Sequence, residues 1–116
     1  MVKPTRYYSK KQETRVATLV GGKRQSNSGA TTFDKGDVVD RYMLFECKTA
    51  TKPMKSFSIK KDWFLKNKKE ALSIGKEFGA VVFDFGSTED FVALSMNDFL
   101  NLYSAWKDSV QVKGDD

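Results

Sequence analysis

The sequence predicts an α/β fold, a single domain in which a mixed central β-sheet is flanked by helices. Three observations lead to this prediction. Helical and extended apolar patterns alternate along the chain. Residues 80–85 are almost wholly apolar, as is typical of a central strand covered on both faces. The length of 116 residues suits one ordinary core and is short for two.

The expected element order is α-β-β-β-α-β-β-α. In chain order we expect a helix over 9–19, strands over 36–39, 42–48 and 56–59, a long helix over 60–78, strands over 80–85 and 91–94, and a helix that starts after Ser95.

The first helix rests on Val16 and Leu19, which stand among polar residues at helical spacing, and Gly21-Gly22 is suited to end it. The polar Gly/Ser/Asn-rich stretch that follows predicts a loop. Two short apolar runs around Asp40-Arg41 are a hairpin candidate. The "SFSI" segment, after a loop containing Lys and Pro, completes three strands.

In the second half, Phe64, Ala71, Ile74 and Phe78 lie close to one helical face and predict the long helix. Turn residues separate the apolar run 80–85 from "FVAL". Ser95, followed three residues later by an acid, is typical of a helix start. Residues 109–116 are expected to form a frayed tail.

Composition excludes several classes of site. With one cysteine, Cys47, and no histidine, the chain cannot form an intrachain disulfide, and a zinc site or a histidine-based catalytic triad is disfavoured. Any metal should be bound through oxygen. No apolar run approaches the roughly 20 residues of a membrane span, and the N-terminus lacks a signal-peptide core, so a cytoplasmic location is expected.

The net charge of +5, with lysine and arginine gathered in residues 3–24 and 52–69, suggests a polyanionic partner. A lysine-rich solvated surface explains the charge equally well.

Charged residues in the hairpin candidate predict a site. Strand alternation places Glu46 and Lys48 on one face. A two-residue turn at Asp40-Arg41 would bring Asp37 to the same face, one diagonal step from Glu46. A three-residue turn would instead set Asp34 opposite Glu46 and send Asp37 to the other face, which makes Asp34 the reserve candidate.

Carboxylates this close repel each other unless a cation lies between them, and their hard oxygens suit Mg²⁺ or Mn²⁺. Asp37 and Glu46 are therefore the expected metal ligands, with the main-chain carbonyl of Cys47 as a further candidate. Such an ion would activate water for phosphodiester hydrolysis, and Lys48 would orient that water or offset phosphate charge. The alternative is an edge hairpin with a surface Asp and an ordinary Glu–Lys pair.

Gly36-Asp37-Val38 followed by Glu46-Cys47-Lys48 resembles the motif of the PD-(D/E)XK nuclease superfamily, with Gly36 in place of the proline. Residues 10–95 also resemble archaeal-type and RecU-type Holliday-junction resolvases and small phage-encoded relatives. The resemblance implies a restriction-endonuclease-like core, and an Mg²⁺-dependent DNA endonuclease in which Asp37, Glu46 and Lys48 are catalytic. The chain has no room for the RecU-type N-terminal region and stalk.

The resemblance also implies further residues. Glu13 matches an acid of the first helix that supports the metal or its water, although it also suits an exposed helix position. Ser26 and Ser28 match a loop that approaches the scissile phosphate, where Gly21, Gly22 and Gly29 permit close approach and Arg24 adds charge, unless the stretch is a plain linker. Lys60 and Lys61 are candidate phosphate contacts.

Resolvases of this kind act as symmetric dimers on branched DNA, so the resemblance implies a homodimer and an exposed apolar patch. The aromatic residues Phe99, Tyr103 and Trp106 are candidates for that patch, although they also suit a core. Two other functions stay open: a non-catalytic DNA-binding module of the same fold, and a less selective nicking or repair nuclease.

Overall fold

The computed structural model describes residues 3–25 and 37–114, with side chains up to residue 111. The helices are α1 (Thr5–Val20), α2 (Lys61–Ser73) and α3 (Met96–Gly114), and the strands are β1 (Lys23–Arg24), β2 (Val38–Val39), β3 (Met43–Lys48), β4 (Phe78–Asp84) and β5 (Asp90–Ala93). Together they form one α/β domain with a five-stranded mixed sheet in the order β1-β2-β3-β4-β5. Among the strands in the described residues, only the pair β3–β4 is parallel.

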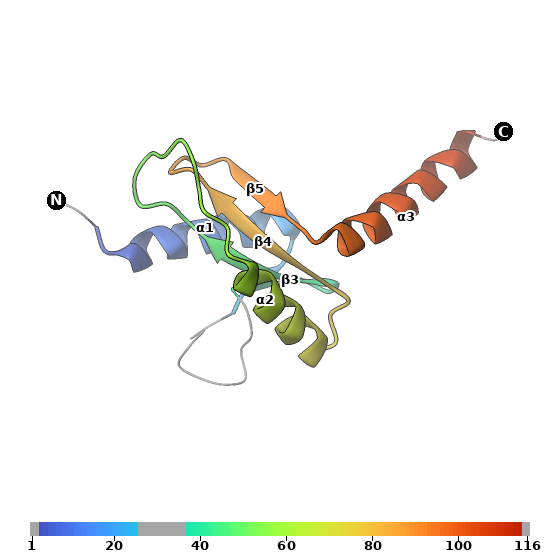
Figure 1. Cartoon of the computed structure of the whole chain (residues 1–116), viewed down its shortest axis with the longest axis horizontal. Helices are drawn as coiled ribbons and strands as arrows, with labels where there is room; N and C mark the ends of the chain where they lie inside the picture. Colours follow the sequence, from blue (N-terminus) through green and yellow to red (C-terminus); the bar gives the residue numbers. More distant parts are fainter. Residues whose placement is uncertain (1–2, 26–36, 115–116) are drawn as a thin grey trace.

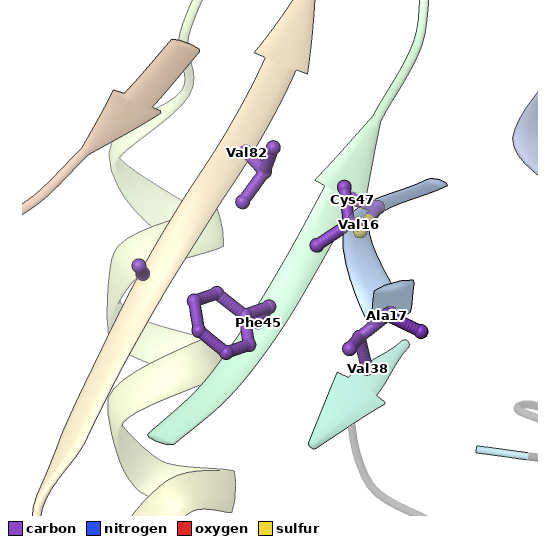
Figure 2. Packing of buried hydrophobic residues seen from close by; sticks show 7 residues of the cluster. Val16, Ala17, Val38, Phe45, Cys47 and Val82 are labelled. Atoms are coloured by element: carbon purple, nitrogen blue, oxygen red, sulfur yellow. The ribbon is translucent and has the colours of Figure 1, made fainter. Parts of the chain in front are cut away.

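The two faces of the sheet are covered by different helices (Figure 1). One buried cluster joins α1 to β2, β3 and β4, and consists of Val16, Ala17, Val38, Phe45, Cys47, Ala80 and Val82 (Figure 2). Alternate residues of β2 and β3, Val39 and Leu44, pack with Ala71 of α2 on the other face. This alternation is the reason why β3 is buried at four successive positions, which include Glu46.

The predicted end of the first helix is confirmed. Gly21 closes α1 in the left-handed conformation, at φ 70°, which costs a glycine little. Gly22 lies so close to the Val39 carbonyl that a Cβ would overlap it. The close approach that Gly22 permits is therefore to β2, and it helps to dock α1 on the sheet.

The long helix is shorter than predicted because α2 ends at Ser73. Gly75, at φ 75°, turns the chain, and the Lys76 N–H donates to the Ala71 carbonyl at 2.8 Å, the closing hydrogen bond of a Schellman motif. Phe78, which continued the helical spacing in the sequence, begins β4 instead.

The strand predicted at 56–59 is wrong. Both edges of β4 are occupied, by β3 and by β5, so the segment cannot pair with β4 as a further strand. Phe57 instead stacks on Phe83, with ring centroids 5.6 Å apart. The first group instead includes β1, in a stretch that was predicted to be a loop.

Strand β5 and the start of the last helix lie where they were predicted. The Ser95 hydroxyl accepts a hydrogen bond from the Asp98 N–H at 3.1 Å and so caps α3. The predicted frayed tail is wrong for residues 109–114, which continue α3.

Gly79→Ala is expected to destabilise the domain by about 1–3 kcal/mol, because a Cβ at Gly79 would overlap the Oδ1 atom of Asn67. Asn67 is 3% exposed and donates from Nδ2 to the Leu44 carbonyl at 3.2 Å, so it has no room to move away. Urea denaturation measures the loss. Gly75→Ala, which meets no side chain but is strained at positive φ, separates conformational strain from steric overlap.

Candidate active site

The hairpin brings Asp37 beside Glu46. Strands β2 and β3 pair through Val38–Phe45 and Val39–Leu44, a register shifted by two residues from the predicted one. Asp37 precedes β2 and bonds the main chain of Phe45 and Cys47, the two neighbours of Glu46. Asp40 occupies the first position of the turn, where aspartate is favoured, so the two central residues are Arg41 and Tyr42. The Asp40 Oδ1 atom accepts hydrogen bonds from the N–H groups of Tyr42, at 2.8 Å, and Met43, at 2.7 Å.

A shift of two residues preserves the face of the sheet, so the predicted convergence of Asp37, Glu46 and Lys48 is retained. The Lys48 ammonium lies 3.4 Å from Glu46 Oε2. Asp34 lies outside the described residues.

Asp37 also completes the strand ladder. Its N–H donates to the Phe45 carbonyl at 3.0 Å, and its Oδ2 atom accepts from the Cys47 N–H at 2.7 Å. The main-chain N–H and carbonyl of one strand residue point toward the same edge. The Cys47 carbonyl therefore points toward the Asp37 side of β3, as its predicted role requires.

The ionised forms of the Asp37 and Glu46 carboxyl groups are energetically unfavourable in the folded protein. Burial, followed by the Glu13 charge, raises the pKa of Asp37, against the lowering effects of the Cys47 N–H, Lys48 and Glu46. Burial and then repulsion by Asp37 raise the pKa of Glu46, although Lys48 and Lys66 lower it. The Lys48 ammonium therefore does not fully offset the burial that raises both pKa values.

Glu13 belongs to the same electrostatic group. Burial, followed by the Glu46 charge, raises its pKa against the effect of Arg24, whose guanidinium lies 3.4 Å from Glu13 Oε1. Arg24 is thus partly neutralised by Glu13.

Two site residues were not predicted as such. The Trp63 ring lies under the Lys48 ammonium, 4.7 Å from its centroid, and restrains it. Gln12 is 1% exposed and donates from Nε2 to the Lys48 carbonyl at 2.9 Å, while its Oε1 atom finds no partner among the described residues. Trp63 widens the apolar face of the predicted long helix, and Gln12 carries no signal beyond its place before Glu13.

A buried polar network fixes the segment that follows Lys48. Asp84, 2% exposed, accepts hydrogen bonds from the Thr49 hydroxyl at 2.8 Å and the Ala50 N–H at 3.1 Å. Arg15 donates to Asp84 at 3.2 Å and to both oxygens of Asp90, at 2.6 and 2.7 Å. Helix α1 and the end of β3 are therefore held together beside the site.

The site offers few protein ligands for Mg²⁺. Among residues 3–25 and 37–114, no three Asp, Glu or Cys side chains form a metal-binding group. Mg²⁺ commonly takes only one or two carboxylates and fills its other positions with water and phosphate. Asp37, Glu46 and the Cys47 carbonyl meet that requirement, and a divalent cation would relieve the repulsion within the pair. The Cys47 thiol is no nucleophile, since burial raises its pKa.

The other predicted DNA contacts are only partly described. Lys60 and Lys61 are exposed at the start of α2. Ser26, Ser28 and Gly29 lie outside the described residues. Helix α1 carries a basic surface that was not among the predicted DNA contacts. A hollow of about 750 Å³ on this surface is lined in part by Tyr7, Lys10, Lys11 and Arg15.

No protein-family model, curated protein or solved structure matches this chain. Within the part of the chain that the structure describes, no helix is long and apolar enough to cross a membrane. The function must therefore be argued from the site itself.

Proposed function

We propose that this protein is a Mg²⁺-dependent DNA endonuclease that hydrolyses phosphodiester bonds in branched DNA, with the four-way junction as its preferred substrate. The observation that carries the proposal is the close approach of two buried carboxyl groups, Asp37 and Glu46, with Lys48 at 3.4 Å from Glu46. The order of α1, the strands β1–β3, the crossover helix α2 and the parallel strand β4 supports a restriction-endonuclease-like core. The preference for junctions rests on the resemblance alone.

In this proposal, Asp37, Glu46 and the Cys47 carbonyl hold the ion. Mg²⁺, or Mn²⁺ in its place, would polarise a phosphodiester oxygen and lower the pKa of the attacking water. Lys48, restrained between Glu46 and Trp63, orients that water and offsets charge on the phosphate. The water oxygen adds to phosphorus, one P–O bond breaks, and the leaving oxygen receives a proton.

The basic surface suits the phosphate backbone. Lys10 and Lys11 are exposed on α1, and a second hollow joins Lys11 to Thr49 and Ala50 at the end of β3. DNA bound along α1 would therefore reach the segment that follows β3, and its affinity should fall steeply with salt.

A cleavage assay tests the proposal. The protein is incubated with four-way, flap, duplex and single-stranded DNA, with Mg²⁺ or with EDTA. We expect Mg²⁺-dependent cuts, fastest in the four-way junction. Lys48→Ala should slow cutting by roughly 10²–10³-fold, while salt-dependent binding changes little. Lys69→Ala, which removes an exposed lysine of α2, is the matched control.

One observation favours a second candidate, a non-catalytic DNA-binding module. Asp37 already accepts the Cys47 N–H, a role that the hairpin needs without any metal. This candidate predicts salt-dependent binding with no divalent-metal-dependent cleavage of any of the four substrates. Equal cutting of all four would instead indicate the less selective nicking or repair nuclease.

A further inference from the structure

Four aromatic side chains form a row on the face of the sheet that α2 covers. Phe83 of β4 and Phe91 of β5 are paired in register, with ring centroids 5.9 Å apart and planes 28° apart. Strand alternation places Phe83 on the same face as Gly79, which contacts α2. Phe57, from the segment between β3 and α2, stacks on Phe83 at 5.6 Å, and Trp63 of α2 lies 6.3 Å from Phe57. We call these four residues, Phe57, Trp63, Phe83 and Phe91, the aromatic row.

The aromatic row starts at the candidate active site and ends at the edge of the sheet. The Lys48 ammonium lies 4.7 Å from the centroid of the Trp63 ring and 3.4 Å from Glu46 Oε2. At the other end, Phe91 belongs to β5, the outermost strand on this side of the described sheet. A ligand bound along the row would therefore extend from Lys48 toward β5.

The rings of the aromatic row are partly open to solvent. Phe91 is 39% exposed, and the other three members are only partly buried. Neither buried cluster of the described residues includes any of the four rings. The row is therefore accessible to a ligand and is not a component of either cluster.

The segment that carries Phe57 is basic. Residues 48–61 include five lysines and no acidic residue. The exposed lysines of this segment are Lys52, Lys55, Lys60 and Lys61. The Met54 N–H donates to the Phe85 carbonyl at 2.9 Å, which fixes the segment beside the end of β4 (Figure 1). Exposed ammonium groups and accessible aromatic rings thus occur together.

This combination suits single-stranded nucleic acid. Ammonium groups attract the phosphates, and every unpaired base has a flat face that can stack on an aromatic ring, whatever the sequence. In a duplex the faces of the bases are covered by neighbouring bases. Aromatic rings on the protein surface therefore favour unpaired over paired nucleotides.

We propose that the aromatic row binds unpaired nucleotides of a DNA strand, with bases stacked on Phe91 and Phe57 and phosphates held by the lysines of residues 48–61. In branched DNA, the row would take nucleotides that are unpaired at the branch point. The position of this strand relative to the cut rests on the proposed function, because the row starts at Lys48. Binding itself requires neither a metal ion nor cleavage.

Fluorescence anisotropy in EDTA tests the inference without cleavage. The full chain is titrated against a labelled oligothymidylate of about 12 nucleotides and against a duplex of the same length. Phe91→Leu keeps an apolar side chain but has no aromatic face. It should weaken binding of the oligothymidylate by at least roughly 5-fold and change duplex binding by less than about twofold. Phe91→Tyr keeps the ring and should bind like the wild type.

Val92→Ala is the matched control. Val92 is the next residue of β5, is 58% exposed and points to the opposite face of the sheet. Its replacement should leave both affinities within about twofold of the wild type. Phe57→Leu is a second test variant and should act like Phe91→Leu, and thermal midpoints verify that each variant is folded.

Two results would overturn the inference: a wild type that does not bind oligothymidylate in EDTA, or binding that neither Phe91→Leu nor Phe57→Leu weakens. Both results are compatible with Mg²⁺-dependent cleavage of the junction, so the proposed function would stand. Conversely, single-strand binding that Phe91→Leu weakens, in a protein that cuts none of the four substrates, would support the aromatic row and refute the proposed function.

Discussion

Asp37→Asn is expected to reduce Mg²⁺-dependent DNA cleavage by at least roughly 10³-fold and, at neutral pH without metal, to stabilise the fold by about 1 kcal/mol. The variant loses a metal ligand but keeps an oxygen that can accept the Cys47 N–H, so the hairpin is retained. It also removes one charge from a buried, mutually repelling pair. Cleavage rates and metal-free thermal midpoints measure the two effects.

The same pair predicts the pH dependence of stability. Burial raises the pKa of Asp37 and of Glu46 in the folded state, so the native protein holds protons that the unfolded chain releases. The contribution of the pair is fully present below the unfolded pKa values, about 4, and is lost as pH rises through the folded values. The metal-free wild type should therefore lose stability relative to Asp37→Asn over this range, and Mg²⁺ should restore it.

Glu89→Gln is the control, since it neutralises an exposed acid in the turn between β4 and β5. It should leave cleavage and the pH profile of the thermal midpoint unchanged. A metal-free Asp37→Asn protein that is less stable than the wild type at neutral pH would show that the Asp37 charge is needed for folding. Full activity of the variant would refute the metal-ligand role.

Asp84→Ala is expected to cost about 3–5 kcal/mol of folding free energy. The carboxylate accepts hydrogen bonds from the Ala50 N–H, the Thr49 hydroxyl and the Gly86 N–H, and it pairs with Arg15. Alanine would leave the buried main-chain donors unpaired and remove one of the two acids that hold Arg15. Urea denaturation measures the loss.

Asp84→Asn keeps one acceptor oxygen at this position and should lose less than half as much stability. Arg15→Met tests the other side of the network, and it should cost less than Asp84→Ala because Arg15 is partly exposed while Asp84 is buried. A loss below about 1 kcal/mol for Asp84→Ala would contradict the view that this carboxylate organises the end of β3.

Much of the fold could be predicted because its signals are local. Helix α1 ends at Gly21, α3 starts at a Ser95 cap, and β4 is an uninterrupted apolar run. The strand 56–59 could not be excluded from its own pattern, because strand pairing depends on which elements pack beside a segment and not on its residues alone. Strand β1 has two residues, which are too few to show the alternation of apolar and polar residues that is typical of a strand.

For the site, the sequence by itself determined that Asp37, Glu46 and Lys48 share a face, because strand alternation depends on residue number alone. Only the tertiary structure decided how close Asp37 lies to Glu46. The register follows from two hydrogen bonds to Asp40, and the burial that raises both pKa values comes from the helices packed on the sheet. Trp63 and Gln12 reach Lys48 from other elements, and side chains distant in sequence meet only when those elements pack.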